Sequence, residues 1–179
     1  MATNSIIIKY YKTPVGELIL GAYENKLCLA DWRYRKMRAV IDRRISSELH
    51  ADFKEGNSSV FTETESQLKQ FFNQERKEFD LPLLMVGTEF QKQVWKALLD
   101  IPFGETRTYQ DLANILGNPK AIRAVASANG ANAISIIIPC HRIIGSDGKL
   151  IGYAGGLPAK KKLLELEGGI TNAQLDLFS

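Results

Sequence analysis

The spacing of apolar residues changes near residue 85, and this change constrains the fold more than any other feature. Before it, short β-branched runs are joined by turn signals such as Thr13-Pro14-Val15-Gly16; after it, apolar residues recur at intervals of three and four. The first pattern is typical of strands and the second of helices. A chain of 179 residues can form two small domains. We therefore predict an α/β domain over residues 1–84, a mostly helical domain over 85–170 and a tail over 171–179.

Short turns between the apolar runs of the first domain favour an antiparallel meander. Its three strands are expected at residues 6–11, 17–23 and 27–32. A helix is predicted over 36–49, and a second follows Thr62-Glu63-Thr64-Glu65, which has the pattern of a capping box. The polar segment 50–60 is interpreted as a loop, and a final strand is expected over 78–83.

The second domain has the outline of a helix-turn-helix. Its two helices are expected at 109–116 and from Asn118-Pro119 to about Ala128. Thr108 is the predicted N-cap of the first of them. An apolar strand is expected over 134–138, and Asp147-Gly148 favours a hairpin turn after it. A winged variant is therefore predicted, closed by a helix over 158–167.

Composition excludes several classes of protein. The chain is 45% hydrophobic with a net charge of +3, which permits nucleic-acid binding without requiring it. No apolar run approaches the roughly 18 residues of a membrane span, and no secretory signal is visible. Its two cysteines, Cys28 and Cys140, make a poor disulfide framework, and its two histidines leave too few ligands for structural zinc. We expect a reduced, cytoplasmic protein without membrane association, metal or cofactor.

The segment Ile138-Pro139-Cys140-His141-Arg142 carries the most chemical information. A cysteine thiolate is a strong nucleophile when a base or positive field activates it. Pro139 disfavours helix around it and so predicts a turn at Cys140, where a side chain can be presented to a pocket. For an arbitrary Cys-His pair, a buried structural cysteine is the simpler interpretation. The surrounding sequence has to decide between the two.

Residues 87–168 resemble the O6-alkylguanine-DNA alkyltransferases, also called methylated-DNA–protein-cysteine methyltransferases. The matching stretches follow the family's order and include Ile101-Pro102-Phe103-Gly104, Asn118-Pro119-Lys120-Ala121, Pro139-Cys140-His141-Arg142, Gly152-Tyr153-Ala154-Gly155-Gly156 and 163–168. The first 80 residues resemble the family's ribonuclease-H-like domain only loosely. The resemblance implies DNA repair in which Cys140 irreversibly takes the alkyl group from O6 of guanine, once per protein, after base flipping. It leaves O4-methylthymine open as a further substrate.

The same resemblance implies the catalytic residues. Cys140 is the nucleophile, His141 the general base acting through a water, and Glu167 the acid that orients His141. Asn132 is expected to brace the active-site turn, and Tyr109 to donate a proton to the departing guanine. The simpler alternatives are a solvated acid, an ordinary turn asparagine and a core aromatic residue.

A pocket for the flipped base is implied at Pro139, Tyr153, Ala154 and Gly155. Pro139 and Tyr153 would flank the alkyl group, and Gly155 would let the backbone approach a flat base. Many family members carry serine where this chain has Ala154, so one hydroxyl contact to the base is expected to be missing. Arg142 is expected to be structural.

The predicted second helix consists almost entirely of small residues and carries one long side chain, Arg123. Small side chains allow close approach to a narrow groove, and the resemblance implies that this helix binds the minor groove of duplex DNA. Arg123 would enter the stack where the alkylated base leaves. The implied DNA contacts are Tyr109, Ala121, Arg123, Ala124, Ala126 and Ser127. An Ala-rich core helix with one solvated arginine is the simpler alternative.

The tail Gln174-Leu175-Asp176-Leu177-Phe178 resembles the short motif by which bacterial repair proteins dock on the polymerase sliding clamp. Such a peptide can place Leu177 and Phe178 in an apolar groove with Gln174 at the groove's edge. A frayed terminus is the alternative.

Two other functions stay open. A winged helix-turn-helix could recognise alkylated DNA without repairing it, but family members of that type lack the cysteine that is present here as Cys140. A thiol hydrolase could use Cys140 and His141, but it would turn over and would not need the Ala-rich helix. The chain shows no cysteine-rich zinc domain, so transcriptional regulation is not expected. We expect a monomer.

Overall fold

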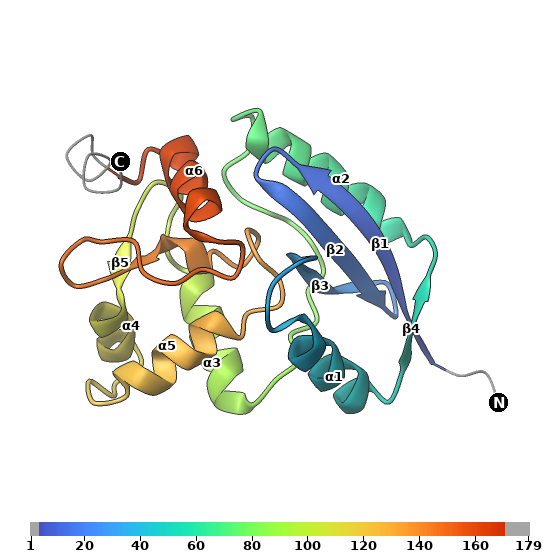
Figure 1. Cartoon of the computed structure of the whole chain (residues 1–179), viewed down its shortest axis with the longest axis horizontal. Helices are drawn as coiled ribbons and strands as arrows, with labels where there is room; N and C mark the ends of the chain where they lie inside the picture. Colours follow the sequence, from blue (N-terminus) through green and yellow to red (C-terminus); the bar gives the residue numbers. More distant parts are fainter. Residues whose placement is uncertain (1–3, 171–179) are drawn as a thin grey trace. The chain divides into compact units, whose positions relative to one another are not determined.

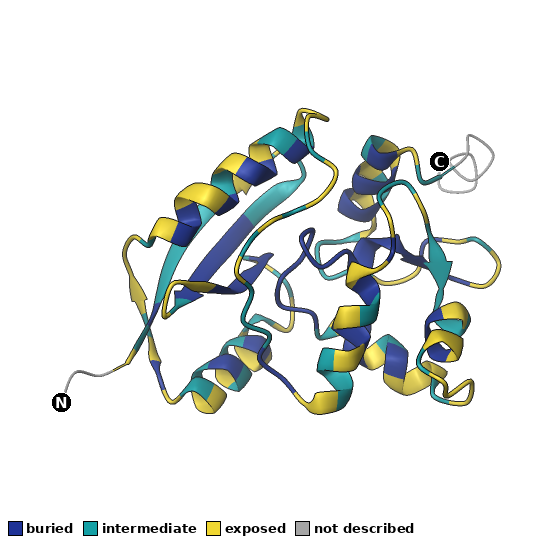
Figure 2. Cartoon of the chain, turned by 180° about the vertical axis from the view of Figure 1, so that it is seen from behind, coloured by how far each residue is buried: buried dark blue, intermediate teal, exposed yellow. Residues whose placement is uncertain are grey.

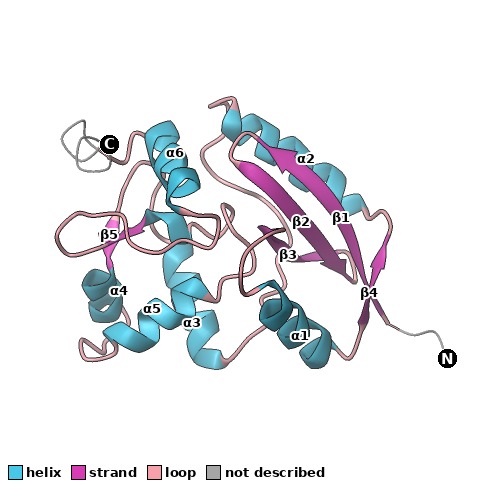
Figure 3. Cartoon of the chain, viewed as in Figure 1, coloured by secondary structure: helices cyan, strands magenta, loops and turns pink. Residues whose placement is uncertain are grey.

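The computed structural model describes residues 4–170 and divides into two compact units after Thr88 (Figure 1). The N-terminal unit combines a four-stranded sheet with two helices, and the C-terminal unit is mostly helical (Figure 3). The elements of the N-terminal unit are β1 (Ser5–Thr13), β2 (Gly16–Tyr23), β3 (Lys26–Trp32), α1 (Arg38–Leu49), β4 (Asp52–Glu55) and α2 (Ser59–Phe72). This order confirms the predicted fold class of sheet plus helices followed by a helical domain.

The sheet has the strand order β3-β2-β1-β4. Its first three strands are antiparallel neighbours, which confirms the meander, and the Thr13 hydroxyl donates to the Gly16 carbonyl at 2.7 Å across the first turn. The fourth strand, β4, runs parallel to β1 and lies in segment 50–60, so the loop prediction there was wrong. Only Phe53 of this polar edge strand is half-buried, which leaves almost no hydrophobic pattern to indicate it.

Two further predictions for this unit were wrong. Residues 78–83 form no strand, and Leu83 makes only an isolated bridge with Leu27. Helix α2 begins at Ser59 after the N-cap Ser58, so Thr62 lies inside the helix and caps nothing. The early start is driven by burial, because Val60 and Phe61, which come before Thr62, already pack in the core.

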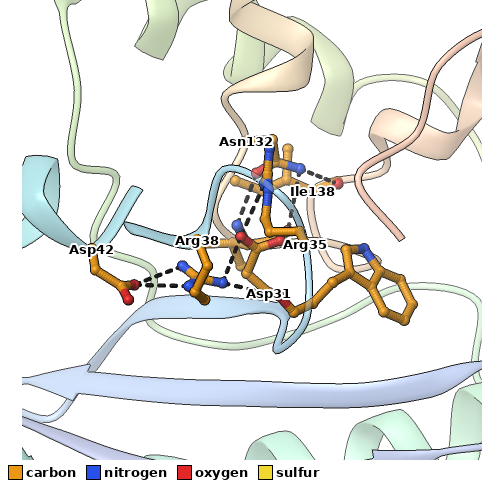
Figure 4. Close-up of polar contacts among 8 residues, drawn as sticks. Asp31, Arg35, Arg38, Asp42, Asn132 and Ile138 are labelled. Carbon is orange, nitrogen blue, oxygen red and sulfur yellow. Dashed lines mark hydrogen bonds and ion pairs between the residues drawn. The ribbon is translucent and has the colours of Figure 1, made fainter. Parts of the chain in front are cut away.

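The core of the N-terminal unit lies along β2 and β3, which are buried over residues 18–22 and 27–32 (Figure 2). Helix α2 packs on this sheet through an apolar face that includes Leu68 and Phe71. The end of β3 carries a buried acid, Asp31, whose Oδ2 accepts from Arg35 and Arg38 at 2.9 Å each. Arg38 also pairs with Asp42 one turn along α1, so these charges fasten the start of α1 to β3 (Figure 4).

The C-terminal unit holds four helices among the residues described. Its elements are α3 (Glu89–Leu99), β5 (Arg107–Thr108), α4 (Tyr109–Ile115), α5 (Ile122–Gly130), the 3₁₀ turn η1 (Cys140–Arg142), β6 (Ile143–Ile144) and α6 (Leu157–Glu167). Thr108 caps α4 as predicted: its hydroxyl accepts from the Asp111 N–H at 3.0 Å, and the Asp111 carboxylate accepts from the Thr108 N–H at 2.8 Å. Helix α5 begins at Ile122, after the N-cap Ala121, and not at Asn118.

The strand expected over 134–138 and the hairpin after it are both absent. The apolar run folds into a tight turn, in which the Ile138 N–H donates to the Ile134 carbonyl at 3.0 Å. The Asp147-Gly148 turn does form, but β6 pairs in parallel with β5, and residues 150–153 are not a strand. None of the helices within residues 4–170 combines the length and apolar character needed to cross a bilayer.

Candidate active site

Cys140 is the first residue of η1 and follows the N-cap Pro139, at the end of the 134–138 turn. Its side chain is buried, and its N–H donates to the Ile138 carbonyl at 2.8 Å. The other cysteine, Cys28, lies inside β3, where burial raises the pKa of its thiol to about 12. Cys28 is therefore a neutral thiol near pH 7, whereas Cys140 directly precedes His141 in η1.

Asn132 braces this turn with both ends of its amide. Its Oδ1 accepts from the Ile134 N–H and its Nδ2 donates to the Ile138 carbonyl, each at 2.9 Å (Figure 4). Between them, Ile136 adopts a φ of 72°, which is unfavourable for a β-branched residue by about 1–3 kcal/mol. Because Asn132 is itself buried, these hydrogen bonds stabilise the strained turn and thereby fix the backbone position of Cys140.

Glu167, at the end of α6, is the common partner of His141 and Arg142. Its Oε1 accepts from His141 Nε2 at 2.8 Å and from Arg142 Nη2 at 2.8 Å, while its Oε2 accepts from Arg142 Nε at 2.9 Å. The side chains of His141 and Glu167 have no exposed surface. Arg142 also donates through Nη1 to the Ile101 carbonyl at 2.6 Å. The buried carboxylate is therefore neutralised by a forked guanidinium and oriented toward the imidazole.

Burial and hydrogen bonding set the protonation states of this cluster. Burial lowers the pKa of His141, and this outweighs the opposing effect of the Glu167 carboxylate. Burial alone would raise the pKa of Glu167, but hydrogen bonds and charge from His141 and Arg142 lower it to about 2. Near neutral pH the pair is therefore a carboxylate beside a neutral imidazole whose proton sits on Nε2. His141 Nδ1 has no hydrogen-bond partner within residues 4–170, so it is the basic nitrogen.

Tyr109 and the segment 151–156 lie in the same unit as this cluster. The Tyr109 hydroxyl donates to the Ile151 carbonyl at 3.3 Å. Burial raises the pKa of Tyr109, a neighbouring Cys140 thiolate raises it further, and the Asn129 side chain opposes both effects. Tyr109 is therefore a protonated phenol near neutral pH. The predicted pocket residues Tyr153, Ala154 and Gly155 are half-buried, and Pro139 is buried.

The predicted DNA-binding helix presents small residues outward. The predicted contacts Ala121, Arg123, Ala124, Ala126 and Ser127 all lie on its exposed or half-exposed surface. The opposite face of α5 is buried through Val125 and Ala128, and Trp95 of α3 donates to the Ala128 carbonyl at 2.8 Å. The long side chain of Arg123 is exposed, so the outer surface of α5 combines small residues with one cation and the apolar side chain of Ile122.

Arg142 and Lys160 make more contacts in this unit than the sequence predicted. Arg142, expected to be structural, acts together with His141 to lower the pKa of Glu167 and keep it ionised. Lys160 was not singled out, yet it is fully buried beneath the segment 151–152. Helical spacing could have found Lys160, because it precedes Leu163, Leu164 and Glu167 by three, four and seven positions on the buried face of α6.

No cluster of three or more His, Cys, Asp or Glu side chains that could hold a metal occurs between residues 4 and 170. The predicted clamp motif, residues 174–178, lies outside the described residues.

Comparison with known proteins places both units. The family model described as 6-O-methylguanine DNA methyltransferase, ribonuclease-like domain, matches residues 6–85, and the model for the DNA binding domain of the same proteins matches residues 89–169. The methylated-DNA–protein-cysteine methyltransferase of Methanosarcina mazei is 56% identical over 156 residues, covering 87% of this chain and 93% of the relative. That of Mycobacterium bovis is 53% identical over 172 residues, covering 94% and 98%.

Solved structures give the same grouping. The chain is similar to the O6-methylguanine methyltransferase of Mycobacterium tuberculosis, with 41% identity, a TM-score of 0.77 and coverage of 97% of this chain and 99% of that one. It is equally similar to the M. tuberculosis protein OGT solved in complex with DNA, with 40% identity, a TM-score of 0.78 and coverage of 98% and 99%.

Glu167→Gln is expected to remove a pH-dependent share of folding stability. The folded pKa of about 2 lies below the unfolded value near 4.5, so ionised Glu167 stabilises the protein above pH 4.5 by about 3 kcal/mol. This contribution disappears as the pH falls from 4.5 toward 2. Urea unfolding of wild type and variant across that range measures it.

The exposed residue Glu165 of the same helix provides the control, because Glu165→Gln is expected to leave the pH dependence unchanged. A stability difference between wild type and Glu167→Gln that stays constant down to pH 2 would contradict the assignment of Glu167 as an ionised, hydrogen-bonded carboxylate.

Proposed function

The chain belongs to the 6-O-methylguanine DNA methyltransferase family, and on that premise we propose that Cys140 is the cysteine that receives the alkyl group. The protein is a DNA repair methyltransferase that transfers the alkyl group from methylated DNA to a cysteine of its own. The observation that carries the assignment is the turn at Cys140, which is braced by Asn132 and followed directly by the His141–Glu167 pair. The same arrangement supports a catalytic set of Cys140, His141, Glu167, Asn132 and Tyr109.

The proposed reaction is an in-line displacement at the alkyl carbon. His141 Nδ1 takes the thiol proton of Cys140 through a water, and Glu167 stabilises the imidazolium that forms. The thiolate sulfur then bonds to the alkyl carbon as the bond from that carbon to guanine O6 breaks, and the electron pair leaves with the base. Tyr109 supplies a proton to the departing guanine, which its neutral phenol allows. The product is a thioether on Cys140, which water does not hydrolyse, so each protein molecule acts once.

DNA binding is assigned to the C-terminal unit, whose family model is the DNA binding domain. We further propose that α5 enters the minor groove, with its small outer residues allowing close approach and Arg123 filling the place of the flipped base. Pro139 and Tyr153 would then flank the alkyl group, with Ala154 and Gly155 against the base. Because α5 presents an exposed Arg123 among small residues, this role fits better than that of a core helix. We propose that the protein acts as a cytoplasmic monomer.

Intact-protein mass spectrometry after mixing with a duplex carrying one O6-methylguanine tests the proposed function. One methyl group per protein is expected, mapped to Cys140, because burial raises the pKa of the Cys28 thiol to about 12 and keeps it protonated. Cys140→Ala is expected to gain nothing, and Cys28→Ala to gain one methyl group as wild type does. DNA binding without any mass gain would favour recognition without repair, and turnover beyond one methyl group per protein would favour a hydrolase.

Arg123→Ala is expected to slow methyl transfer from duplex DNA by roughly tenfold to a hundredfold, because unstacking a base costs a few kcal/mol. Transfer from the same base in a single strand is expected to change little, since there is no stack to fill. Lys162→Ala, which removes an exposed cation from α6, controls for the lost charge. Equal slowing on duplex and single strand would contradict the proposed role of Arg123.

We also propose that the tail docks on a polymerase sliding clamp through Gln174, Leu175, Asp176, Leu177 and Phe178. Fluorescence titration of a labelled tail peptide against the clamp is expected to show saturable binding. Replacement of Leu177 and Phe178 by alanine in the peptide is expected to abolish it, because these side chains would fill the apolar groove. Absence of saturable binding by the native peptide would end this proposal.

A further inference from the structure

Lys160 is a buried cation with an unusual set of partners. Its side chain has no exposed surface, and its Nζ donates to three backbone carbonyls. These belong to Ile143 of β6, Ile151 at 3.0 Å and Gly152 at 3.3 Å. No carboxylate lies within ion-pair distance of Nζ in the part of the chain that the structure describes. An ammonium group has three donors, so all three are used on main-chain oxygens.

Burying an ammonium without a carboxylate is costly, and such groups usually serve a purpose beyond packing. Burial lowers the pKa of Lys160 to about 8, and a thiolate at Cys140 works in the opposite direction by favouring the charged lysine. Near neutral pH the side chain still carries its proton. A methionine or leucine would fill the same space on α6 without this cost, so the hydrogen bonds and the charge are the features that need a role.

The three carbonyls connect parts of the site that are distant in sequence. Strand β6 follows η1 directly, so the Ile143 carbonyl belongs to the residue after Arg142. The Ile151 and Gly152 carbonyls precede Tyr153, the proposed neighbour of the alkyl group. The Ile151 carbonyl also accepts from the Tyr109 hydroxyl at 3.3 Å. Lys160 and Tyr109 therefore donate to the same oxygen, the Ile151 carbonyl. Lys160 thereby connects the segment 151–152 to β6, the strand that follows η1.

None of the neighbouring ionisable groups balances the positive charge of Lys160. Glu167 and Arg142 neutralise each other, and His141 is neutral near pH 7. The Lys160 charge helps to keep His141 neutral, because it lowers the pKa of that imidazole. Tyr109 is a protonated phenol in the same range. Lys160 binds the carbonyl of Ile143, three residues after Cys140, and a thiolate at Cys140 favours the charged form of Lys160. By reciprocity, the Lys160 ammonium favours the Cys140 thiolate.

We propose that Lys160 is a positioning residue for alkyl transfer, which fastens the segment 151–152 to β6 and supplies the positive charge that favours the Cys140 thiolate. It does not touch the reacting atoms. It acts by holding the carbonyl that orients Tyr109 and by biasing the ionisation of Cys140. This inference rests on the proposed function of Cys140 as the alkyl acceptor.

The test compares single-turnover transfer by wild type, Lys160→Met and Lys160→Arg from a duplex carrying O6-methylguanine, over a range of DNA concentrations and pH. Lys160→Met is expected to lower the maximal rate about tenfold or more, because charged hydrogen bonds are lost, while half-saturation in DNA changes little. The rising limb of its pH profile is expected to move to higher pH. Lys162→Met, a change at an exposed lysine of the same helix, is expected to match wild type.

The alkaline side of the pH profile of the transfer rate gives a second readout. This readout is valid even if Lys160→Met does not fold. Wild type is expected to lose rate above about pH 8 as Lys160 deprotonates, whereas Lys160→Arg, which keeps its charge, is expected to lack this descending limb. Circular dichroism and thermal unfolding establish that each variant is folded.

The outcomes separate the two proposals. Methyl transfer to Cys140 by wild type, with Lys160→Met retaining the wild-type rate and pH profile, would overturn the role of Lys160 alone. A descending limb in Lys160→Arg identical to that of wild type would also overturn it. A lower rate with an unmoved pH profile would reduce Lys160 to a packing residue. No transfer to Cys140 by wild type would overturn the proposed function itself.

Discussion

The proposed active site depends on one buried ion pair, the fork between Arg142 and Glu167. A carboxylate with no exposed surface is stable only when its charge is matched, and Arg142 matches it through two hydrogen bonds. Once Glu167 is ionised, it fixes the proton of His141 on Nε2 and leaves Nδ1 basic. The same guanidinium binds the Ile101 carbonyl, so the loop after α3, the turn η1 and the end of α6 are held by one group. Gly104 allows the loop after α3 to approach the end of α6 closely, because a Cβ at this position would lie 3.0 Å from the Glu167 carbonyl oxygen.

A second constraint places Cys140, the proposed nucleophile, relative to that pair. The chain reaches Cys140 through a turn in which Ile136 has an unfavourable positive φ, and Asn132 holds the turn from inside. Backbone strain of this kind persists only where the surroundings over-determine the conformation. Asn132 thus fixes the backbone position of Cys140, and Glu167 fixes the side chains of the two residues that follow it, His141 and Arg142. The position of Cys140 is therefore set by contacts on both sides of it in the sequence.

Local chemistry in the sequence predicted much of this, and its failures have physical causes. The Thr108 cap of α4 and the helix ending at Glu167 are set by short-range rules, and both were predicted correctly. Strand β4 was missed because pairing with β1 is a long-range contact that a polar tetrapeptide does not reveal. The run 134–138 has the composition of a strand, but the Asn132 side chain supplies hydrogen bonds that a neighbouring strand would otherwise make. The partners of Arg142 lie 25 and 41 residues away, and those of Lys160 are backbone oxygens 8 to 17 residues away, so no local pattern assigns them.

The most direct test of the central claim is the tautomer of His141, read from nitrogen-15 chemical shifts of the imidazole rings. The chain has only two histidines, and exposed His50 provides the internal reference. A neutral ring at pH 7 with the proton on Nε2 is expected, and Glu167→Gln is expected to lose that preference. An imidazolium at pH 7, or a neutral ring protonated on Nδ1, would contradict the claim that the Arg142–Glu167 pair prepares His141 as the base.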